Sequence, residues 1–378
     1  MAASFTRRDF LRYGGVTAAF AASMTASPLR AITRDAAAFA QSLPDGGRRQ
    51  RVLLFHDPSF PTIDSAVYAR EALLRALPHA DVRTVSADGF AAALREGGVD
   101  LVITAHGSAF PEDAGMALLG YLARAGNWLQ LGGVPLAVPV RRAADGWEQG
   151  PRRTRWHRKL GLTQAFRVDC AEVGRWSAAP GAETINDAAS SFACASAFAL
   201  YWRLTSTKHF PQEDGSAGPR DALLRPLIIG TPANGAPKSP VGADDLPVTA
   251  AAVQLDWLHG DYAGGRWILA SGDSCLAEDL LGQLASLASC GAVGFSVLPV
   301  HARCRPGEPP SLRLRLHRPR RAGKADCLIE IHPDGQAPRS VRATLAWSES
   351  LPVGTAEVTL PELAADPGAQ PLDRKSVV

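Results

Sequence analysis

The feature that most constrains the fold is a regular alternation of strand-like and helix-like segments in the first part of the chain. Short apolar runs, which are typical of buried strands, begin near residues 51, 80, 100 and 127. Three segments between them have apolar residues at helical spacing: 63–78, 88–97 and 111–126. Asp88 is the expected N-cap of the second helix, and Gly97 is its expected stop. Because the strands and helices alternate with short connections, the pattern predicts an α/β fold with a doubly wound parallel sheet.

The regular pattern ends near residue 140. Residues 140–223 are polar and rich in Gly and Pro, which predicts long excursions from the sheet. Strand patterns return at 224–231, 248–258 and 265–272, and a last helix follows. Beyond residue 293, short strands with period-2 alternation are separated by Pro and Gly. This second pattern predicts an antiparallel β-sandwich with an immunoglobulin-like layout.

The N-terminus carries the most specific motif in the sequence. The stretch "TRRDFLR" resembles the twin-arginine export motif, with Arg7 and Arg8 as its arginine pair and an Ala/Gly-rich segment behind them. That segment is too short and too weakly apolar to span a membrane, so we interpret it as a removable signal peptide. A disordered basic tail is the alternative. The motif predicts a bacterial protein that the twin-arginine translocase exports to the periplasm or beyond, without a stable membrane anchor.

These patterns divide the chain into three expected regions. Residues 1–45 hold the signal peptide and a linker, residues 46–293 the α/β domain, and residues 294–378 the β-sandwich. The last region is short for a sandwich, and its final residues do not continue the strand pattern. We therefore expect the chain to be the N-terminal fragment of a longer protein.

Composition argues against several kinds of partner. A net charge of +3 with scattered Lys and Arg does not favour nucleic-acid binding, and the basic run from Arg313 to Arg321 alternates with Leu as a half-exposed strand does. The six Cys residues show no C-x-x-C spacing and no nearby His cluster, so no metal site is expected. No motif indicates a cofactor. Disulfides are open, because the sequence does not show which Cys residues would pair.

Polar residues follow three of the predicted strands at their carboxyl ends, where open parallel sheets bind ligands. The candidate ligand-binding residues at this edge are His56, Asp57, Ser59, His106, Ser108 and Gly133. The His, Asp and Ser side chains suit acid–base chemistry or the recognition of sugar hydroxyls. A purely structural role is the alternative for three of them: an Asx-turn at Asp57, a helix cap at Ser108, and a hydrogen-bonded core position at His106.

Two stretches carry a resemblance to a known family. "ITAHGSAFPEDAGMALLGYLARAGNWLQLGGVPLAVPV" and "GGRWILASG" resemble the class I glutamine amidotransferase-like, flavodoxin-like domains that are attached to bacterial carbohydrate-active enzymes, with the β-galactosidase trimerisation-type domain as a related case. Catalytic members of that fold place a Cys at the turn after the fourth strand. Here Val134 and Pro135 follow Gly132 and Gly133 in that turn, and none of them can act as a nucleophile. The resemblance therefore implies a non-catalytic module that serves assembly or glycan contact and can form a homo-oligomer.

Two other functions stay open. A free-standing periplasmic hydrolase or amidase would use His56, Asp57 and His106 and needs these side chains to converge on a pocket. A periplasmic binding or scaffold protein would perform no chemistry. Cys275 lies between a strand and a helix, where a thiolate would be stabilised, but a helix cap by Asp273 or Ser274 is the simpler interpretation of that stretch. Trp147, Trp156 and Trp176 in the long loops are candidates for sugar stacking, with packing inside the fold as the alternative.

Overall fold

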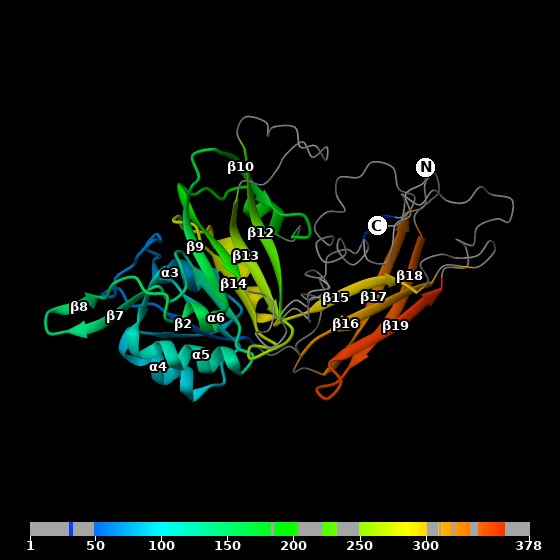
Figure 1. The fold of residues 1–378 in the computed structure, drawn as a ribbon, viewed down its shortest axis with the longest axis horizontal. Helices are drawn as coiled ribbons and strands as arrows, with labels where there is room; N and C mark the ends of the chain where they lie inside the picture. The colour runs from blue at the N-terminus through cyan, green and yellow to red at the C-terminus, as the bar shows by residue number, and fades with distance from the viewer. Residues whose placement is uncertain are drawn as a thin grey trace, which may run out of the picture.

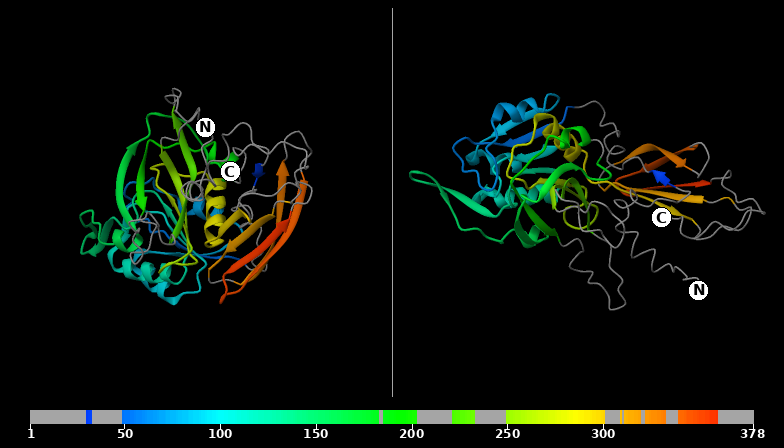
Figure 2. Two further views of the ribbon diagram at one scale, coloured as in Figure 1. Left: turned by 45° about the vertical axis from the view of Figure 1, so that its right-hand side comes forward. Right: turned by 90° about the horizontal axis from the view of Figure 1, so that it is seen from above.

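The computed structural model describes residues 30–32, 49–182, 185–202, 221–232, 249–300, 309, 311–319, 322–332 and 339–359. The described residues form an α/β part followed by an all-β part (Figures 1 and 2). The twin-arginine motif lies outside the described residues. No helix in the described ranges is long and apolar enough to cross a membrane.

An eight-stranded mixed sheet forms the centre of the α/β part, in the order β10-β12-β13-β14-β6-β4-β2-β3. Its parallel strands are β2 (Arg51–Phe55), β3 (Asp81–Val85), β4 (Leu101–Thr104), β6 (Trp128–Leu131) and β14 (Arg266–Ala270). Its antiparallel strands are β10 (Val173–Ala178), β12 (Ala222–Pro232) and β13 (Thr249–Trp257). The predicted parallel strands are thus present, and the sheet continues into an antiparallel half that the sequence pattern did not predict.

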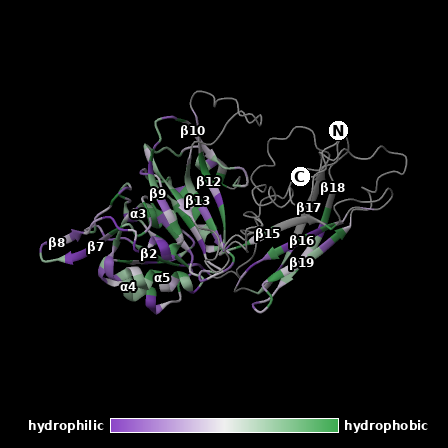
Figure 3. Ribbon diagram, viewed as in Figure 1, coloured by the Kyte–Doolittle hydropathy of each residue, from purple (hydrophilic) through white to green (hydrophobic). Residues whose placement is uncertain are grey.

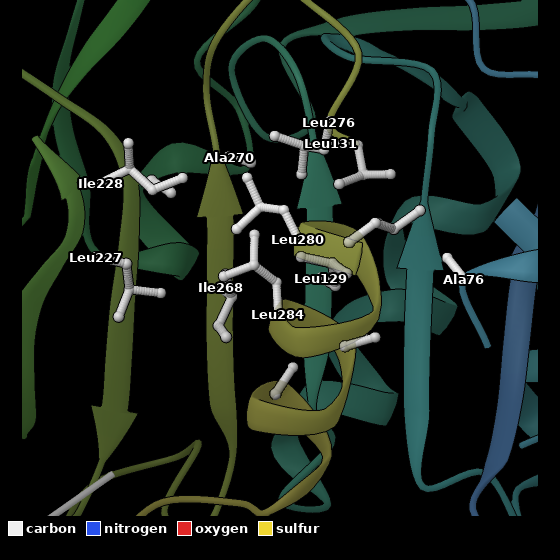
Figure 4. Packing of buried hydrophobic residues seen from close by; sticks show 14 of the residues in the cluster. Ala76, Leu129, Leu131, Leu227, Ile228, Ile268, Ala270, Leu276, Leu280 and Leu284 are labelled. Atoms are coloured by element: carbon white, nitrogen blue, oxygen red, sulfur yellow. The ribbon is translucent and has the colours of Figure 1, made fainter. Parts of the chain in front are cut away.

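Helices cover both faces of the parallel strands. Helices α3 (Arg70–Arg75) and α8 (Glu278–Ser289) contribute to one buried cluster, and α4 (Ala87–Glu96) and α5 (Gly115–Ala123) contribute to the other. Figure 4 shows side chains of α8 lying over β14 and β6. The Leu side chains at 280, 281, 284 and 287 of α8 are almost fully buried. Burial of each of these side chains stabilises the fold by about 1.5–3 kcal/mol, because its apolar surface is removed from water.

A buried ion pair ties the two halves of the sheet together. Arg266 of β14 and Asp256 of β13 are both fully buried, and Arg266 Nε lies 2.6 Å from Asp256 Oδ1. Gln254 donates a further hydrogen bond to Asp256 Oδ2, and Arg266 donates another to the carbonyl of Leu287 in α8. Because both charges are paired and hydrogen-bonded, these interactions offset the free-energy cost of removing the two charges from water.

The helix predicted over residues 63–78 is much shorter in the structure, where only Arg70–Arg75 are helical. The reason is long-range pairing, because Ile63 forms a bridge to Gly107 and its carbonyl accepts the backbone N–H of Ser108. This pairing holds the first residues of the segment extended across the carboxyl ends of β2 and β4. Helix α4 begins at Ala87 after Ser86, so Asp88 is not its N-cap, and Gly97 ends it with φ of 75° as predicted.

Residues 140–223 contain more regular structure than their composition predicts. The β-hairpin of β7 (Val138–Ala143) and β8 (Gly146–Gln149) projects from the α/β part and is largely hydrophilic (Figure 3). A second antiparallel pair joins β9 (Leu162–Asp169) to β11 (Ser196–Trp202). The other described elements of the α/β part are β5 (Ala109–Pro111), the 3₁₀ helix η1 (Glu112–Ala114), α6 (His157–Leu160) and α7 (Asn186–Ala189).

Within the described residues, the all-β part contains two three-stranded antiparallel sheets, and antiparallel strands are what the period-2 pattern predicted. One contains β15 (Gly294–Pro299), β16 (Ser311–His317) and β19 (Val353–Thr359), and the other β1 (Arg30–Ile32), β17 (Gly323–His332) and β18 (Arg339–Trp347). Leu314 of β16, Leu345 of β18 and Val358 of β19 share one buried cluster, so the two sheets pack on a common core. The immunoglobulin-like layout stays a prediction.

Candidate functional site

The turn after β6 has the sharp geometry that the sequence predicted. Strand β6 ends at Leu131, and both glycines behind it adopt left-handed backbone conformations, with φ of 74° at Gly132 and 61° at Gly133. Glycine adopts this region without the steric cost that a Cβ imposes on other residues. Because β2, β4, β6 and β14 are parallel, this turn lies at the same sheet edge as the ends of those strands. We call residues 132–135 the elbow.

Neighbouring side chains fill the space above the elbow. A Cβ built on Gly132 would lie 2.1 Å from Ser65 Oγ and 2.2 Å from Ser65 Cβ. A Cβ built on Gly133 would lie 2.3 Å from the backbone nitrogen of Ser108. These separations are shorter than any real contact of a Cβ atom. Neither glycine position can therefore carry a nucleophilic side chain while the surrounding chain stays in place.

Ser108 joins the elbow to the loop above it. Its hydroxyl accepts the backbone N–H of Val134 at 2.8 Å and donates to the Asp64 carboxylate at 2.5 Å. Asp64 also pairs with Arg152, at 2.5 Å. Ser108 is fully buried, and its hydroxyl does not cap the helix that follows. The structure thus places this predicted site residue in a hydrogen-bond network that fixes the elbow.

His106 and Asp57 are direct neighbours and are both buried. His106 Nε2 accepts the backbone N–H of Asp57 at 3.1 Å, so the imidazole proton is on Nδ1, which lies 3.1 Å from Thr62 Oγ1. Burial, with the nearby His56 as a smaller cause, lowers the pKa of His106 to about 4. The ring is therefore neutral at pH 7, with both nitrogens engaged in hydrogen bonds.

The Asp57 carboxylate serves the local fold. Its Oδ1 accepts the backbone N–H of Ser59 in an Asx-turn, and its Oδ2 accepts the N–H of Ala87 at the start of α4. Burial favours a higher pKa, but the hydrogen bonds from Ser59 and Ala87 outweigh it and hold the pKa of Asp57 below its usual value. The anion also lies at the positive end of a helix, so it stabilises the N-terminus of α4.

His56 and Ser59 complete the predicted set. The His56 ring lies 5.9 Å from that of His106, and its Nε2 donates to the carbonyl of Tyr68. The Ser59 hydroxyl donates to Asp57 and accepts the indole N–H of Trp147. His56, Asp57 and His106 therefore lie close together, but the hydrogen bonds described for them connect them to the protein fold.

A small cavity opens beside the elbow, on the same edge of the sheet. Its volume is about 240 Å³, and it is lined by Asp64, Ser65, Arg167, Ser196, Phe198 and Asp273. The β9–β11 pair contributes one wall, the loop after β2 contributes a second, and the residues after β14 contribute a third. We call this cavity the edge pocket. Ser65 both lines the edge pocket and fills the space above Gly132.

The edge pocket presents both signs of charge. Asp273 accepts hydrogen bonds from the backbone of Ala195 and from the backbone and hydroxyl of Ser196. Burial favours a higher pKa for Asp273, but these hydrogen bonds outweigh it and lower the pKa below its usual value. Arg167 donates from Nε to the Ser196 hydroxyl at 3.2 Å. Its terminal guanidinium nitrogens have no hydrogen-bond partner within the described ranges.

Sequence reasoning missed the edge pocket because its lining residues come from segments with no site-like motif. Asp273 follows strand β14 at the carboxyl edge, and that position was the one available signal. The sequence predicts a helix cap there, whereas α8 begins at Glu278 with Ala277 as its N-cap and no side-chain capping bond. The sequence pattern also predicts a helix at Ser65 and irregular excursions at Arg167 and Ser196.

Two of the open alternatives near the site are not supported by the structure: sugar-stacking faces on Trp156 and Trp176, and a stabilised thiolate at Cys275. Trp156 and Trp176 are buried and offer no stacking face, whereas Trp147 is partly exposed with the Arg142 guanidinium 4.0 Å from its ring centroid. The sulfur of Cys275 lies in surroundings that raise its pKa through burial, so its thiolate is not stabilised. Among the described residues, no group of three or more His, Cys, Asp or Glu side chains is arranged to hold a metal ion.

Comparison with known proteins gives a distant structural likeness. No family model and no curated protein matches the chain. A catalytic mutant of a GH42 β-galactosidase from G. stearothermophilus is 10% identical with a TM-score of 0.35, and the match covers 82% of this chain and 40% of that one. The β-galactosidase from Halorubrum lacusprofundi is 17% identical with a TM-score of 0.34, and the match covers 84% of this chain and 41% of that one.

A cold-adapted β-galactosidase from Rahnella sp. R3 is 12% identical with a TM-score of 0.30, over 82% of this chain and 41% of that one. The chain thus matches about 40% of the length of these enzymes.

Proposed function

We propose that the α/β part is a non-catalytic module that contacts glycans through the edge pocket. The observation that carries this proposal is the filled elbow: Ser65 and Ser108 occupy the space that a nucleophile on Gly132 or Gly133 would need. The edge pocket lies next to this position, at the sheet edge that hosts ligands in open α/β folds.

The composition of the edge pocket suits a sugar. Asp273 offers carboxylate oxygens as acceptors, and Arg167 offers guanidinium donors to ring hydroxyls. Phe198 adds an aromatic side chain, which packs against the apolar C–H face of a sugar ring. A volume of about 240 Å³ is below the roughly 300–1,000 Å³ typical of sites for drug-sized ligands, which favours a single sugar unit.

The wider context of the module is part of the proposal and comes from the sequence. The twin-arginine motif supports export through the twin-arginine translocase to the periplasm or beyond. The resemblance to domains attached to carbohydrate-active enzymes supports a place within a longer glycoside hydrolase-type protein. There the module would serve glycan contact and assembly, including assembly into a homo-oligomer.

Calorimetric titration of the purified chain with a panel of monosaccharides and short oligosaccharides tests the glycan contact. We expect binding to at least one sugar and no release of product from any glycoside or amide in parallel assays. Arg167→Ala should weaken that binding about tenfold or more, since hydrogen bonds to charged groups contribute about 1.5–3 kcal/mol. Gln164→Ala, on the exposed surface of the same strand, is the matched control and should leave the affinity unchanged.

The possible outcomes separate the alternatives. Turnover that is lost in His106→Asn would support the hydrolase that uses His56, Asp57 and His106, and would overturn the non-catalytic proposal. Absence of binding across the panel would favour a scaffold. Binding that survives Arg167→Ala would place the glycan contact outside the edge pocket.

A further inference from the structure

We propose that Cys170 and Cys194 form a disulfide that closes the end of the β9–β11 pair next to the edge pocket. Their sulfur atoms lie 3.9 Å apart. Cys170 directly follows β9, and Cys194 lies two residues before β11. The modification is independent of the proposed glycan contact, because it follows from the positions of the two thiols.

The backbone around the two thiols is already held in the arrangement that a disulfide needs. The last residues of the strand pair, Asp169 and Ser196, are directly opposite each other, and the backbone N–H of Cys170 donates to the carbonyl of Ala195 at 3.0 Å. A disulfide bond is about 2.05 Å long, so the sulfurs must approach by about 2 Å. Rotation of the two side chains can supply most of this movement, because both Cβ atoms are attached to strand ends that already pair.

The local packing also favours a covalent link. Cys170 is buried in the main cluster of the α/β part, and Cys194 packs against the same cluster. Cys194 Sγ would lie 3.5 Å from a Cβ on Gly272, so the residues after β14 confine it from the other side. Burial raises the pKa of both thiols. The Cys170 thiol and the Asp273 carboxylate raise the pKa of Cys194 further. Oxidation should therefore be slow at neutral pH and faster in alkaline buffer.

The chemistry is ordinary thiol–disulfide exchange. The thiolate of Cys194, the more accessible of the two, attacks one sulfur of glutathione disulfide and releases one reduced glutathione. The thiolate of Cys170 then attacks the mixed disulfide at Cys194 and releases a second reduced glutathione. Two electrons pass from the protein to the oxidant, and the two thiol protons end on the two glutathione molecules.

The test is peptide mapping of the full chain by mass spectrometry after incubation with glutathione disulfide at alkaline pH, without reduction. We expect a peptide pair linked through Cys170 and Cys194. The link closes a loop that contains β10 and α7, and it should raise the Tm by about 5 °C over the reduced protein. Cys275→Ser, which removes an exposed thiol elsewhere, is the matched control and should keep both results.

Cys194→Ser should lose both the linked peptides and the oxidant-dependent rise in Tm. Cys194 is only partly buried, so this variant should fold even where Cys170→Ser does not. A stable glutathione adduct on Cys194, or a link from Cys194 to any other Cys, would overturn the proposal. An unchanged Tm in the wild-type protein after complete oxidation would also overturn it.

Discussion

The substitution Gly132→Ala tests whether Ser65 fills the elbow. The new methyl group would lie 2.1 Å from Ser65 Oγ, 2.2 Å from Ser65 Cβ and 3.0 Å from Ser65 Cα. The obstacle therefore includes atoms close to the backbone, which cannot move aside as the tip of a long side chain can. Gly132 also has φ of 74°, which a residue with a Cβ adopts at a cost of about 1–2 kcal/mol.

Gly97→Ala separates these two contributions. Gly97 has φ of 75°, almost the same as Gly132, but a Cβ at Gly97 would meet no atom within 4 Å. We expect Gly97→Ala to lower the free energy of unfolding by about 1–3 kcal/mol from the backbone conformation alone, because its ψ of −159° lies in a region that is essentially restricted to glycine. Gly132→Ala should lose a further 1–3 kcal/mol or so, which is typical of an added methyl group in a filled space.

Removal of the obstructing Ser65 side chain should recover the further stability that Gly132→Ala loses. In the background of Ser65→Gly, the Cβ of Gly132→Ala loses its two nearest neighbours, Ser65 Oγ at 2.1 Å and Ser65 Cβ at 2.2 Å. We therefore expect a coupling free energy of about 1–3 kcal/mol between the two positions in a double-mutant cycle. Gly97→Ala should show no coupling to Ser65→Gly, because nothing from the loop after β2 lies near it.

Urea unfolding followed by tryptophan fluorescence measures these free energies. The buried indoles of Trp128 and Trp267 lie within the α/β part, so their signal reports on the correct part of the chain. Equal losses for Gly132→Ala and Gly97→Ala, together with no coupling to Ser65→Gly, would refute the filled elbow. A side chain would then fit at the elbow, and the main argument against a catalytic site there would fall.

Three further predictions concern the polar groups inside the fold. Asp256→Asn should lower the free energy of unfolding by about 3–5 kcal/mol, because it leaves the Arg266 charge buried without its counter-charge. Arg313→Ala, which removes the exposed Arg313–Glu357 pair, should cost at most about 1 kcal/mol. Urea unfolding of the two variants compares these losses. Ser108→Ala should cost about 1–3 kcal/mol in the same assay, since it leaves the N–H of Val134 and its partners unsatisfied. His106 has a pKa of about 4 in the folded protein, so below pH 6.5 its side chain binds a proton in the unfolded chain but stays neutral in the folded one. The free energy of unfolding should therefore fall by up to about 3 kcal/mol as the pH falls from 6.5 to 4. His106→Gln should make this fall smaller.

The parallel part of the sheet could be predicted because its signals are local. The strand at residues 51–55 and the helix at 278–289 each bury a face, so their apolar spacing is visible within one segment. The rule that ligands meet the carboxyl ends of parallel strands then placed His56, His106 and Gly133 at one edge, where the structure also places them.

The edge pocket could not be predicted because long-range pairing creates it. Ser65 leaves its expected helix because Ile63 hydrogen-bonds to a segment more than forty residues later in the chain. Arg167 and Ser196 face the cavity because β9 pairs with a strand beyond a long intervening segment. Neither interaction leaves a periodic pattern in the sequence, and β9 is mostly exposed, so it lacks the alternation of a half-buried strand.

Ser65 contacts the elbow and also lines the edge pocket beside it. The same residue occupies the space that a Cβ on Gly132 would need and forms part of the lining of the edge pocket. Ser65→Gly would enlarge the pocket and free the space above Gly132 at the same time, whereas Gly133 would stay blocked by the backbone nitrogen of Ser108. Moving that nitrogen would break its hydrogen bond to the carbonyl of Ile63, which holds the loop in place. A side chain on Gly133 therefore requires rebuilding the loop itself, so the edge pocket and the filled elbow are two consequences of one loop conformation.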